Sequence, residues 1–200
     1  MSRHNALAGF VLAGLVSLLS PVVANAATYQ IDPTHTHVGF KVKHMMVSWV
    51  RGSFSDISGV VEFDPARPEA TKVNATVKVL SVDTGMADRD DHLKKADFFD
   101  VAKFPEMKFV SKSVSNVSPE GFDVLGDLTI RGVTKPATFR FTTPSGEMKD
   151  PWGNYKRGFT ASTKVNRQDF GMSFNAVLDA GGAMVGDEVL VEVEVEIARK

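Results

Sequence analysis

The stretch "VLVEVEVEI", residues 189–197, decides the fold, because its apolar and polar side chains alternate with a period of two. In an extended strand successive side chains point to opposite faces. One face would then carry Val189, Val191, Val193, Val195 and Ile197, and the other Leu190, Glu192, Glu194 and Glu196. A helix would bring together residues three and four apart and mix the two sets. The stretch therefore predicts a β-strand with one face toward a core or cavity and the other toward water.

The same alternation recurs along the chain. Val38, Phe40, Val42 and His44 alternate with lysines, residues 73–79 repeat the pattern, and further strand candidates are 53–63, 106–114, 121–131, 137–142 and 156–165. Eight strands with one convincing helical segment indicate an antiparallel sheet rather than βαβ units. Eight is also the number at which an up-and-down barrel closes around one small ligand. The sequence predicts an all-β, eight-stranded antiparallel barrel with a short helical insertion between strands 3 and 4; a two-sheet sandwich is the alternative.

The first 26 residues have the three parts of a secretory signal peptide. Arg3 supplies the positive start, residues 6–19 form an apolar run, and Ala24-Asn25-Ala26 is a small-residue cleavage site. The apolar run is shorter than the ~20 residues that span a bilayer. We expect cleavage after Ala26, which leaves residues 27–200 as one exported domain that does not span a membrane.

Composition excludes several classes of function. The 23 basic and 24 acidic residues nearly balance, so the charge does not favour a nucleic-acid partner. The chain has no cysteine, so it has neither a disulfide nor a thiol nucleophile. No serine stands in a G-x-S-x-G motif, and no catalytic residue is predicted.

The acidic segment "GMADRDDHLKKADFFD", residues 85–100, is explained first as a helix with favourable end charges. Asp88 would cap a helix from about Arg89 to Ala96, and the pairs Asp90–Lys94 and Asp91–Lys95 would support it. A calcium loop would need a glycine at its sixth position, and zinc would need more than His92. What remains is Arg89, His92 and Leu93 on one helical face, which could meet a polar head group with an apolar tail.

Three further histidines are candidate functional residues. His44 continues the apolar face of its strand, so it points inward either as a hydrogen-bonded core residue or toward a ligand. His35 and His37 have H-x-H spacing, but without a third ligand nearby we expect a surface or capping role. The sequence therefore predicts no metal site.

Phenylalanine dominates the aromatic residues, with 14 against two tyrosines and two tryptophans. Seven lie at inward positions of the expected strands: Phe40, Phe54, Phe63, Phe109, Phe139, Phe141 and Phe159. Core packing explains such residues in most proteins. In a barrel the same side chains could wall an elongated apolar cavity.

Several motifs together resemble one known family. They are "YQIDPTHTHVGFKVKHMMVSWVRGSF", "VDTGMADRDDHLKKADFFDVAKFPEMKF", "GDLTIRGVTKP", "RQDFGM" and "VGDEVLVEVEVEI". In order and spacing they resemble the YceI-like family of bacterial periplasmic proteins, over about residues 28–198. The resemblance implies a lipocalin-like barrel that encloses a long isoprenoid or other amphipathic lipid, with no metal, no other cofactor and no known catalysis.

These expectations combine into one functional prediction. The chain would be a periplasmic carrier of a long-chain isoprenoid lipid, a polyprenyl phosphate or an isoprenoid quinone; a general amphiphile-binding stress protein or an enzyme acting on such a lipid are the alternatives. The apolar cavity would be lined by Phe40, Val42, Phe54, Val77, Leu93, Phe109, Phe139, Phe141 and Phe159. His44, Arg51, Arg89 and His92 would contact the head group. A homodimer is expected only because symmetric dimers are the commonest oligomers.

Overall fold

The computed structural model describes residues 26–176 and 183–200. The expected signal peptide lies outside these ranges, apart from Ala26. Within the described ranges, none of the helices combines the length and apolar character that crossing a membrane requires.

The chain is built almost entirely of antiparallel strands. They are β1 (Ala27–Ile31), β2 (His37–His44), β3 (Ser48–Phe54), β4 (Ile57–Phe63), β5 (Lys72–Lys78), β6 (Val82–Asp83), β7 (Glu106–Ser118), β8 (Gly121–Ile130), β9 (Val133–Thr142), β10 (Met148–Lys149), β11 (Tyr155–Asn166) and β12 (Val185–Arg199). The helical elements of the described part are α1 (Ala87–Leu93) and the 3₁₀ turns η1 (Pro68–Ala70), η2 (Val79–Ser81) and η3 (Arg167–Phe170).

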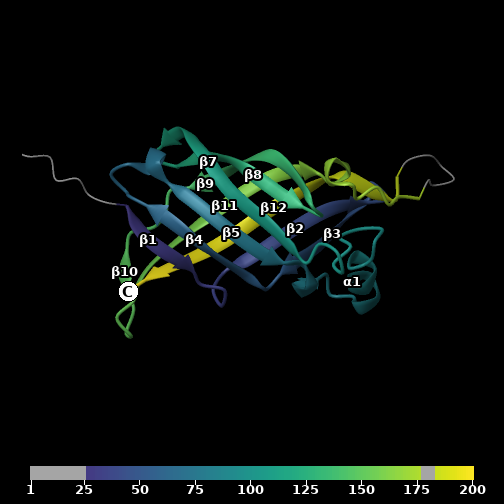
Figure 1. Cartoon of the computed structure of the whole chain (residues 1–200), viewed down its shortest axis with the longest axis horizontal. Coiled ribbons are helices and arrows are strands. Elements are labelled where there is room, and N and C mark those ends of the chain that lie inside the picture. Colours follow the sequence, from purple (N-terminus) through teal and green to yellow (C-terminus); the bar gives the residue numbers. More distant parts are fainter. Residues whose placement is uncertain (1–25, 177–182) are drawn as a thin grey trace, which may run out of the picture.

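The strands form a closed eight-stranded antiparallel barrel, as the sequence predicts (Figure 1). The sheet runs β11-β9-β8-β7-β5-β4-β1-β12, and β12 pairs back with β11 along its length. β1 and β2 lie end to end along the other edge of β12, while their partners β4 and β3 form the next position of the barrel. The sandwich alternative is therefore wrong.

The strand boundaries differ from the prediction at the first two positions of the barrel. β1 was not predicted, because its five residues "ATYQI" show little alternation. The candidate 53–63 joins the last residues of β3 to β4, which are separate strands in the structure. The remaining candidates coincide with β2, β5, β7, β8, β9, β11 and β12, and α1 lies between β5 and β7 as expected.

The alternation of β12 places its two faces as predicted. Val195 and Ile197 are buried in the core, and Glu192 and Glu194 are exposed. The strands of the barrel contribute their inward residues to one continuous cluster, whereas both residues of β10 are exposed. Burial of this apolar surface is the main source of stability for such a fold.

Helix α1 is positioned differently from the sequence prediction. The helix begins after Met86, which makes no side-chain capping bond, so the prediction that Asp88 caps it is wrong. Asp90 Oδ1 instead accepts hydrogen bonds from the backbone nitrogen and the hydroxyl of Thr84, at 2.8 and 2.6 Å. The helix also ends at Leu93, where the Leu93 carbonyl accepts from Phe99 N and the chain turns back.

The charge pairs on α1 also differ from those expected. Lys94 Nζ lies 3.3 Å from Asp91 Oδ1, a spacing of three residues, whereas pairs at a spacing of four were predicted. Asp90 is directed to Thr84 and the strand-to-helix connection. The acidic residues of α1 therefore fix the connection as well as complementing the helix dipole.

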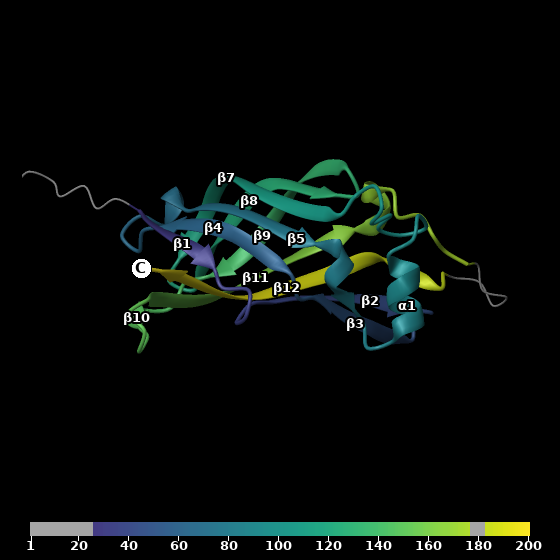
Figure 2. The same cartoon turned by 60° about the horizontal axis from the view of Figure 1, so that its bottom comes forward.

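The barrel has two unlike ends. Helix α1 stands at one end beside β2 and β3, and β10 and the C-terminus lie at the other (Figures 1 and 2). At the α1 end, Met45 N in the β2–β3 turn donates to Met184 O, which joins this turn to the segment before β12.

Candidate functional site

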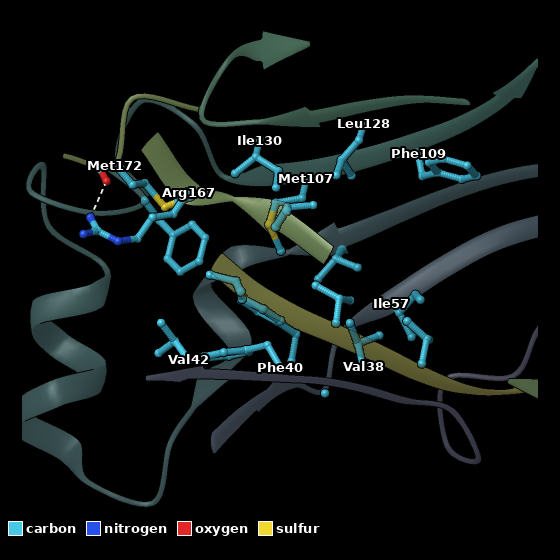
Figure 3. A pocket seen from close by; sticks show the side chains of 18 of the residues that line it. Val38, Phe40, Val42, Ile57, Met107, Phe109, Leu128, Ile130, Arg167 and Met172 are labelled. Carbon is cyan, nitrogen blue, oxygen red and sulfur yellow. Dashed lines mark hydrogen bonds between the residues drawn. The ribbon is translucent and has the colours of Figure 1, made fainter. Parts of the chain in front are cut away.

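The barrel encloses an apolar cavity of about 410 Å³. This volume falls in the range of ~300–1,000 Å³ that is usual for small-molecule sites. Its wall includes Val38, Phe40 and Val42 from β2, Ile57 from the neighbouring β4 and, on the opposite side, Phe109 from β7 (Figure 3). At one end the lining includes α1 and residues before β12; we call this end the mouth.

The nine apolar residues that the sequence assigns to the cavity all line it. They are Phe40, Val42, Phe54, Val77, Leu93, Phe109, Phe139, Phe141 and Phe159. Eight of them occupy alternate, inward-facing positions of their strands, and Leu93 reaches the cavity from α1. Their contact with a ligand stays a prediction.

The phenylalanine rings pack against one another as well as against the cavity. Phe109 and Phe139 have ring centroids 4.8 Å apart at a steep angle, and Phe141 and Phe159 stack at 5.2 Å. Such pairs contribute about 0.5–1.5 kcal/mol beyond their buried area. The wall is therefore held by contacts within the protein and is formed before any ligand enters.

The ionisable side chains that line the cavity are cations or histidines. They are Lys43, His44, Arg89, His92, Lys108 and Arg167. Among the described lining residues there is no carboxylate. An apolar wall with cationic and imidazole groups near its mouth suits a ligand with a long apolar part and a head group that is anionic or accepts hydrogen bonds.

Arg89 is held at the mouth by the loop before α1. Its Nε donates to Thr84 Oγ1 at 2.7 Å and its Nη2 to Thr84 O at 2.8 Å. In the described part of the chain its Nη1 has no protein partner, so this nitrogen is available to a ligand. The bonds to Thr84 fix the side chain in advance, which reduces the entropy lost on binding.

His92 joins α1 to the segment that follows η3. Its ring lies edge-on to Phe98 and Phe174, with centroids 5.0 Å away in each case. Nε2 lies 3.1 Å from Asp97 Oδ2. The aromatic contacts place His92 at the rim of the mouth, with one ring nitrogen already bonded to the protein.

His44 ends β2 and lines the same cavity. The structure shows no side-chain hydrogen bond to it from any described residue, so it is not the hydrogen-bonded core histidine that was one of the two alternatives. Its half-buried imidazole can reach a ligand from the β2 side of the mouth.

Arg51 does not lie at the mouth, and that prediction is wrong. It is exposed on the outer face of β3, opposite Lys41 of β2, because its neighbour Val50 takes the inward position. Arg51 and Lys41 border a separate outer groove together with Glu192. Strand parity decides the outcome, since alternate residues of β3 face opposite sides.

Arg167 lines the cavity but was not predicted, although it opens the motif "RQDFGM". It is 3% exposed and donates five hydrogen bonds. Four go to backbone carbonyls between residues 172 and 186, and one goes to Asp187 Oδ1 at 3.0 Å. All five guanidinium N–H groups are thereby satisfied, so Arg167 shapes the mouth and has no donor left for a ligand.

Arg131 makes a second link across this rim. It lies in the β8–β9 turn, within the motif "GDLTIRGVTKP", and its Nη2 donates to Ala96 O at 2.7 Å. Its Nη1 also contacts Gly171 O, just after η3. Two of the family motifs therefore supply arginines that hold the segments around the mouth together.

One group of residues outside the cavity has the spacing of a metal site. Asp32, His35 and Glu196 bring their ligand atoms within 4.8 Å of one another. Lys156 Nζ lies 3.1 Å from Asp32 Oδ2 and 2.5 Å from Glu196 Oε1. Bonds from the Thr34 hydroxyl, His35 and Lys156 hold the pKa of Asp32 well below its usual range. Lys156 already forms an ion pair with each of the two carboxylates, and exposed His35 has the surface role expected for it.

A polar cluster closes the end of the barrel opposite the mouth. Buried Tyr29 donates its hydroxyl proton to Glu147 Oε1 at 2.6 Å, and Arg199 makes two bonds of 2.9 Å to the same carboxylate. Arg157 Nε donates to the Tyr29 hydroxyl at 3.0 Å. The hydrogen bonds from Arg199 are the main reason that the pKa of Glu147 lies below its usual value.

A closed antiparallel barrel with an apolar cavity and a cationic mouth defines a β-barrel of the small-ligand-binding type. The chain belongs to the YceI family, because the model of the YceI-like domain matches residues 29–197. A UPF0312 protein of Pseudomonas savastanoi pv. phaseolicola is 46% identical over 158 residues, which cover 78% of this chain and 82% of the relative.

Two solved structures are similar in fold. The YceI protein of Campylobacter jejuni is 36% identical, with a TM-score of 0.65 over 84% of this chain and 96% of its own. A polyisoprenoid binding domain from Saccharophagus degradans, implicated in plant cell wall breakdown, has a TM-score of 0.60 over 88% of this chain and all of its own. At 14% identity the second likeness concerns the fold alone.

Proposed function

We propose that this protein binds one long-chain isoprenoid lipid inside the barrel and carries it through the periplasm. The observation that supports the proposal is the cavity itself: its wall is apolar, and its ionisable groups are all basic or imidazole side chains. An isoprenoid tail would lie along the phenylalanine and valine wall. The head group would stay at the mouth.

Burial of the tail would supply the binding energy. Each buried methylene contributes about 0.8 kcal/mol, so ten of them contribute about 8 kcal/mol. Association and ordering of a flexible chain cost roughly 4–15 kcal/mol. A short tail would therefore bind weakly, and only a long one would leave a favourable balance, which is why a long-chain ligand is favoured.

Polar groups at the mouth would select the head group. Arg89 Nη1 is free for a phosphate oxygen or a quinone carbonyl, and His44 faces the same cavity. This set favours a polyprenyl phosphate over an uncharged quinone, because charge-assisted hydrogen bonds are the stronger ones.

The neighbour from Saccharophagus degradans is described as polyisoprenoid-binding, and it shares the barrel fold. Such distant likeness makes an isoprenoid a reasonable first ligand to test. The proposal itself rests on the cavity of this chain.

A general amphiphile-binding function is the second candidate. Met107, Met172 and Met184 line the cavity, and methionine adapts easily to ligands of different shape. Catalysis would need an acid/base pair in the cavity, and no described residue supplies a carboxylate next to His44. No specific observation favours the enzyme alternative.

A pair of tryptophan substitutions on β12 tests the cavity. Val191→Trp would fill the cavity opposite Phe40, whereas Glu192→Trp adds the same side chain to the outer face of the same strand. We expect Val191→Trp to weaken binding of a polyprenyl phosphate at least tenfold in a fluorescence titration, and Glu192→Trp to bind as the wild type does. Equal affinity in all three proteins would contradict binding inside the barrel.

The periplasmic location is part of the proposal and has its own test. The expected cleavage after Ala26 predicts a mature protein that begins at Ala27. N-terminal sequencing of protein from a periplasmic fraction would check this. An uncleaved chain found only in the cytoplasmic fraction would contradict it.

A further inference from the structure

The turn between β2 and β3 carries three exposed apolar residues beside the mouth. Met45, Met46 and Val47 are 43%, 60% and 83% exposed, and we call them the hairpin tip. Met45 N donates to the carbonyl of Met184, a cavity-lining residue, at 2.8 Å. His44, directly before the tip, lines the cavity as well. The hairpin tip is therefore part of the rim through which a ligand would enter.

The backbone of the hairpin tip is poorly matched to its residues. Met45 and Met46 have φ angles of +49° and +58°, and Val47 N bonds to His44 O at 3.0 Å. Turns with two consecutive positive φ angles normally contain Asn-Gly, because these residues tolerate the left-handed conformation. Two exposed methionines add no core packing in return. Fold stability does not explain their presence, whereas contact with an apolar partner would.

A basic strip adjoins the hairpin tip on the outer face of β2 and β3. Lys43 Nζ lies 4.4 Å and Lys41 Nζ 5.6 Å from the ring centre of half-buried Trp49, and Arg51 is opposite Lys41. Within the described residues these three cations make no ion pair with a carboxylate. On this face of β12, Glu188 lies nearest the tip and pairs with Lys164 of β11 at 3.4 Å. Glu192 and Glu194 are opposite Gly39 and His37, farther from the tip. The basic strip is Lys41, Lys43, Trp49 and Arg51.

We propose that the hairpin tip and the basic strip dock the protein on a lipid bilayer that carries anionic head groups. Exposed apolar side chains enter the interfacial region of a bilayer, and a tryptophan flanked by lysines is suited to the head-group level. Each lysine or arginine near an anionic surface adds to the attraction. Charge complementarity thus selects a lipid surface over an apolar protein groove. Docking there turns the mouth toward the membrane.

The inference goes beyond the proposed lipid-carrier function, because it concerns an outer surface and its partner. The opposite end of the barrel supplies a matched control. Met148 and Trp152 are 72% and 84% exposed there, beside the polar cluster of Tyr29 and Glu147 that closes the barrel. If exposed apolar residues were enough for docking, both ends of the barrel would bind a bilayer equally. Only the mouth end also carries the basic strip.

Vesicle flotation with the mature full-length chain tests the proposal. The vesicles are phosphatidylcholine alone, or equal parts of phosphatidylcholine and phosphatidylglycerol. The variant Met45→Asn/Met46→Gly introduces the residues that the turn geometry prefers, so it should unfold at the same temperature as the wild type or higher. We expect wild-type binding to the anionic vesicles, at least tenfold weaker binding by this variant, and unchanged binding by the control Met148→Ser/Trp152→Ser.

A charge variant completes the experiment. Lys41→Gln/Lys43→Gln should weaken flotation with anionic vesicles, and added salt should weaken wild-type binding. Equal flotation of the tip variant and the wild type would overturn the proposal, as would a loss confined to the Met148/Trp152 control. A wild-type dimer that the tip variant converts to monomers, with no vesicle binding by either, would also overturn it and make the tip an interface between copies. Lipid retained in the cavity is measured separately by extraction, so failure of the carrier function is distinguishable from failure of docking.

Discussion

Arg167 is a buried cation whose partners are almost all backbone carbonyls. Its five hydrogen bonds connect η3 to residues 172–174 and to the start of β12. Removing the guanidinium would leave several carbonyl groups without a donor in a buried place. Such unsatisfied groups each cost about 1–3 kcal/mol.

We expect Arg167→Met to lower the free energy of unfolding by about 3–5 kcal/mol, the cost of breaking a buried charged network. Urea denaturation would measure it. Arg167→Lys keeps the positive charge but has fewer N–H donors, so it should lower the free energy of unfolding by less. A loss below about 1 kcal/mol in Arg167→Met would contradict the role assigned to this residue.

Arg89 has a free donor at the mouth, so its effect should depend on the head group. We expect Arg89→Met to weaken binding of a polyprenyl phosphate about tenfold more than binding of the matching uncharged polyprenol, a difference of about 1.4 kcal/mol. Titrating both lipids cancels any general loosening of the loop at Thr84. Equal weakening for the two lipids would mean that Arg89 only supports the fold.

Individual residues also show where sequence reasoning succeeded and failed. Phe40 and Val42 were placed correctly because parity along one strand decides their direction. Arg51 was misplaced because the predicted strand begins at residue 53, whereas β3 begins at Ser48 and its alternation turns Arg51 outward. Arg167 was missed because its partners lie in segments that only the folded chain brings close.

At the scale of the element, α1 depends on the residue that fixes its connection to β6. Asp90 accepts two hydrogen bonds from Thr84, whereas Asp88 is exposed and makes no capping bond. We expect Asp90→Ala to destabilise the fold by about 1 kcal/mol, the usual cost of losing a cap-like contact, and Asp88→Ala to have a smaller effect. Thermal unfolding would compare them. A larger destabilisation by Asp88→Ala than by Asp90→Ala would contradict this and support Asp88 as the cap.

The polar cluster at the closed end should make stability depend on pH. Bonds from Arg199 lower the pKa of Glu147 in the folded state, so its contribution is present above the unfolded pKa and is lost as the pH falls through the folded value. We expect Glu147→Gln to cost about 2 kcal/mol at pH 7. The difference from wild type should shrink below about pH 4, near the ordinary carboxyl pKa. A difference that is constant down to pH 2 would contradict this.

The strands were more predictable than the helix. Alternation in β12 extends over many residues and has only one consistent interpretation, because a shift by one residue would bury its glutamates. Helix α1 spans seven residues, and several acidic residues could cap it equally well by sequence alone. Its true boundaries depend on Thr84 and on the turn at Phe99, which are contacts outside the helical pattern.

For the whole molecule, closure of the barrel follows from the number and alternation of the strands, and the apolar cavity follows from the inward phenylalanines and valines. Two positions of the barrel are each filled by two short strands, β1 with β2 and β3 with β4. The sequence carries no clear signal for these interruptions. The mouth was predicted in part, since His44 and the Arg89–His92–Leu93 face of the helix were assigned to a ligand and line the cavity there. The β2–β3 turn and the segments held by Arg131 and Arg167 join them only in the folded chain. The homodimer stays a prediction that light scattering of the purified protein would check.

The central claim is that the barrel holds one isoprenoid lipid. Native mass spectrometry of the protein purified from the periplasm under mild conditions, followed by solvent extraction, tests it most directly. The account predicts a mass increment that corresponds to one lipid per chain, released on denaturation and identified in the extract as a single isoprenoid species. A chain without bound lipid, or one carrying a mixture of unrelated amphiphiles, would contradict it.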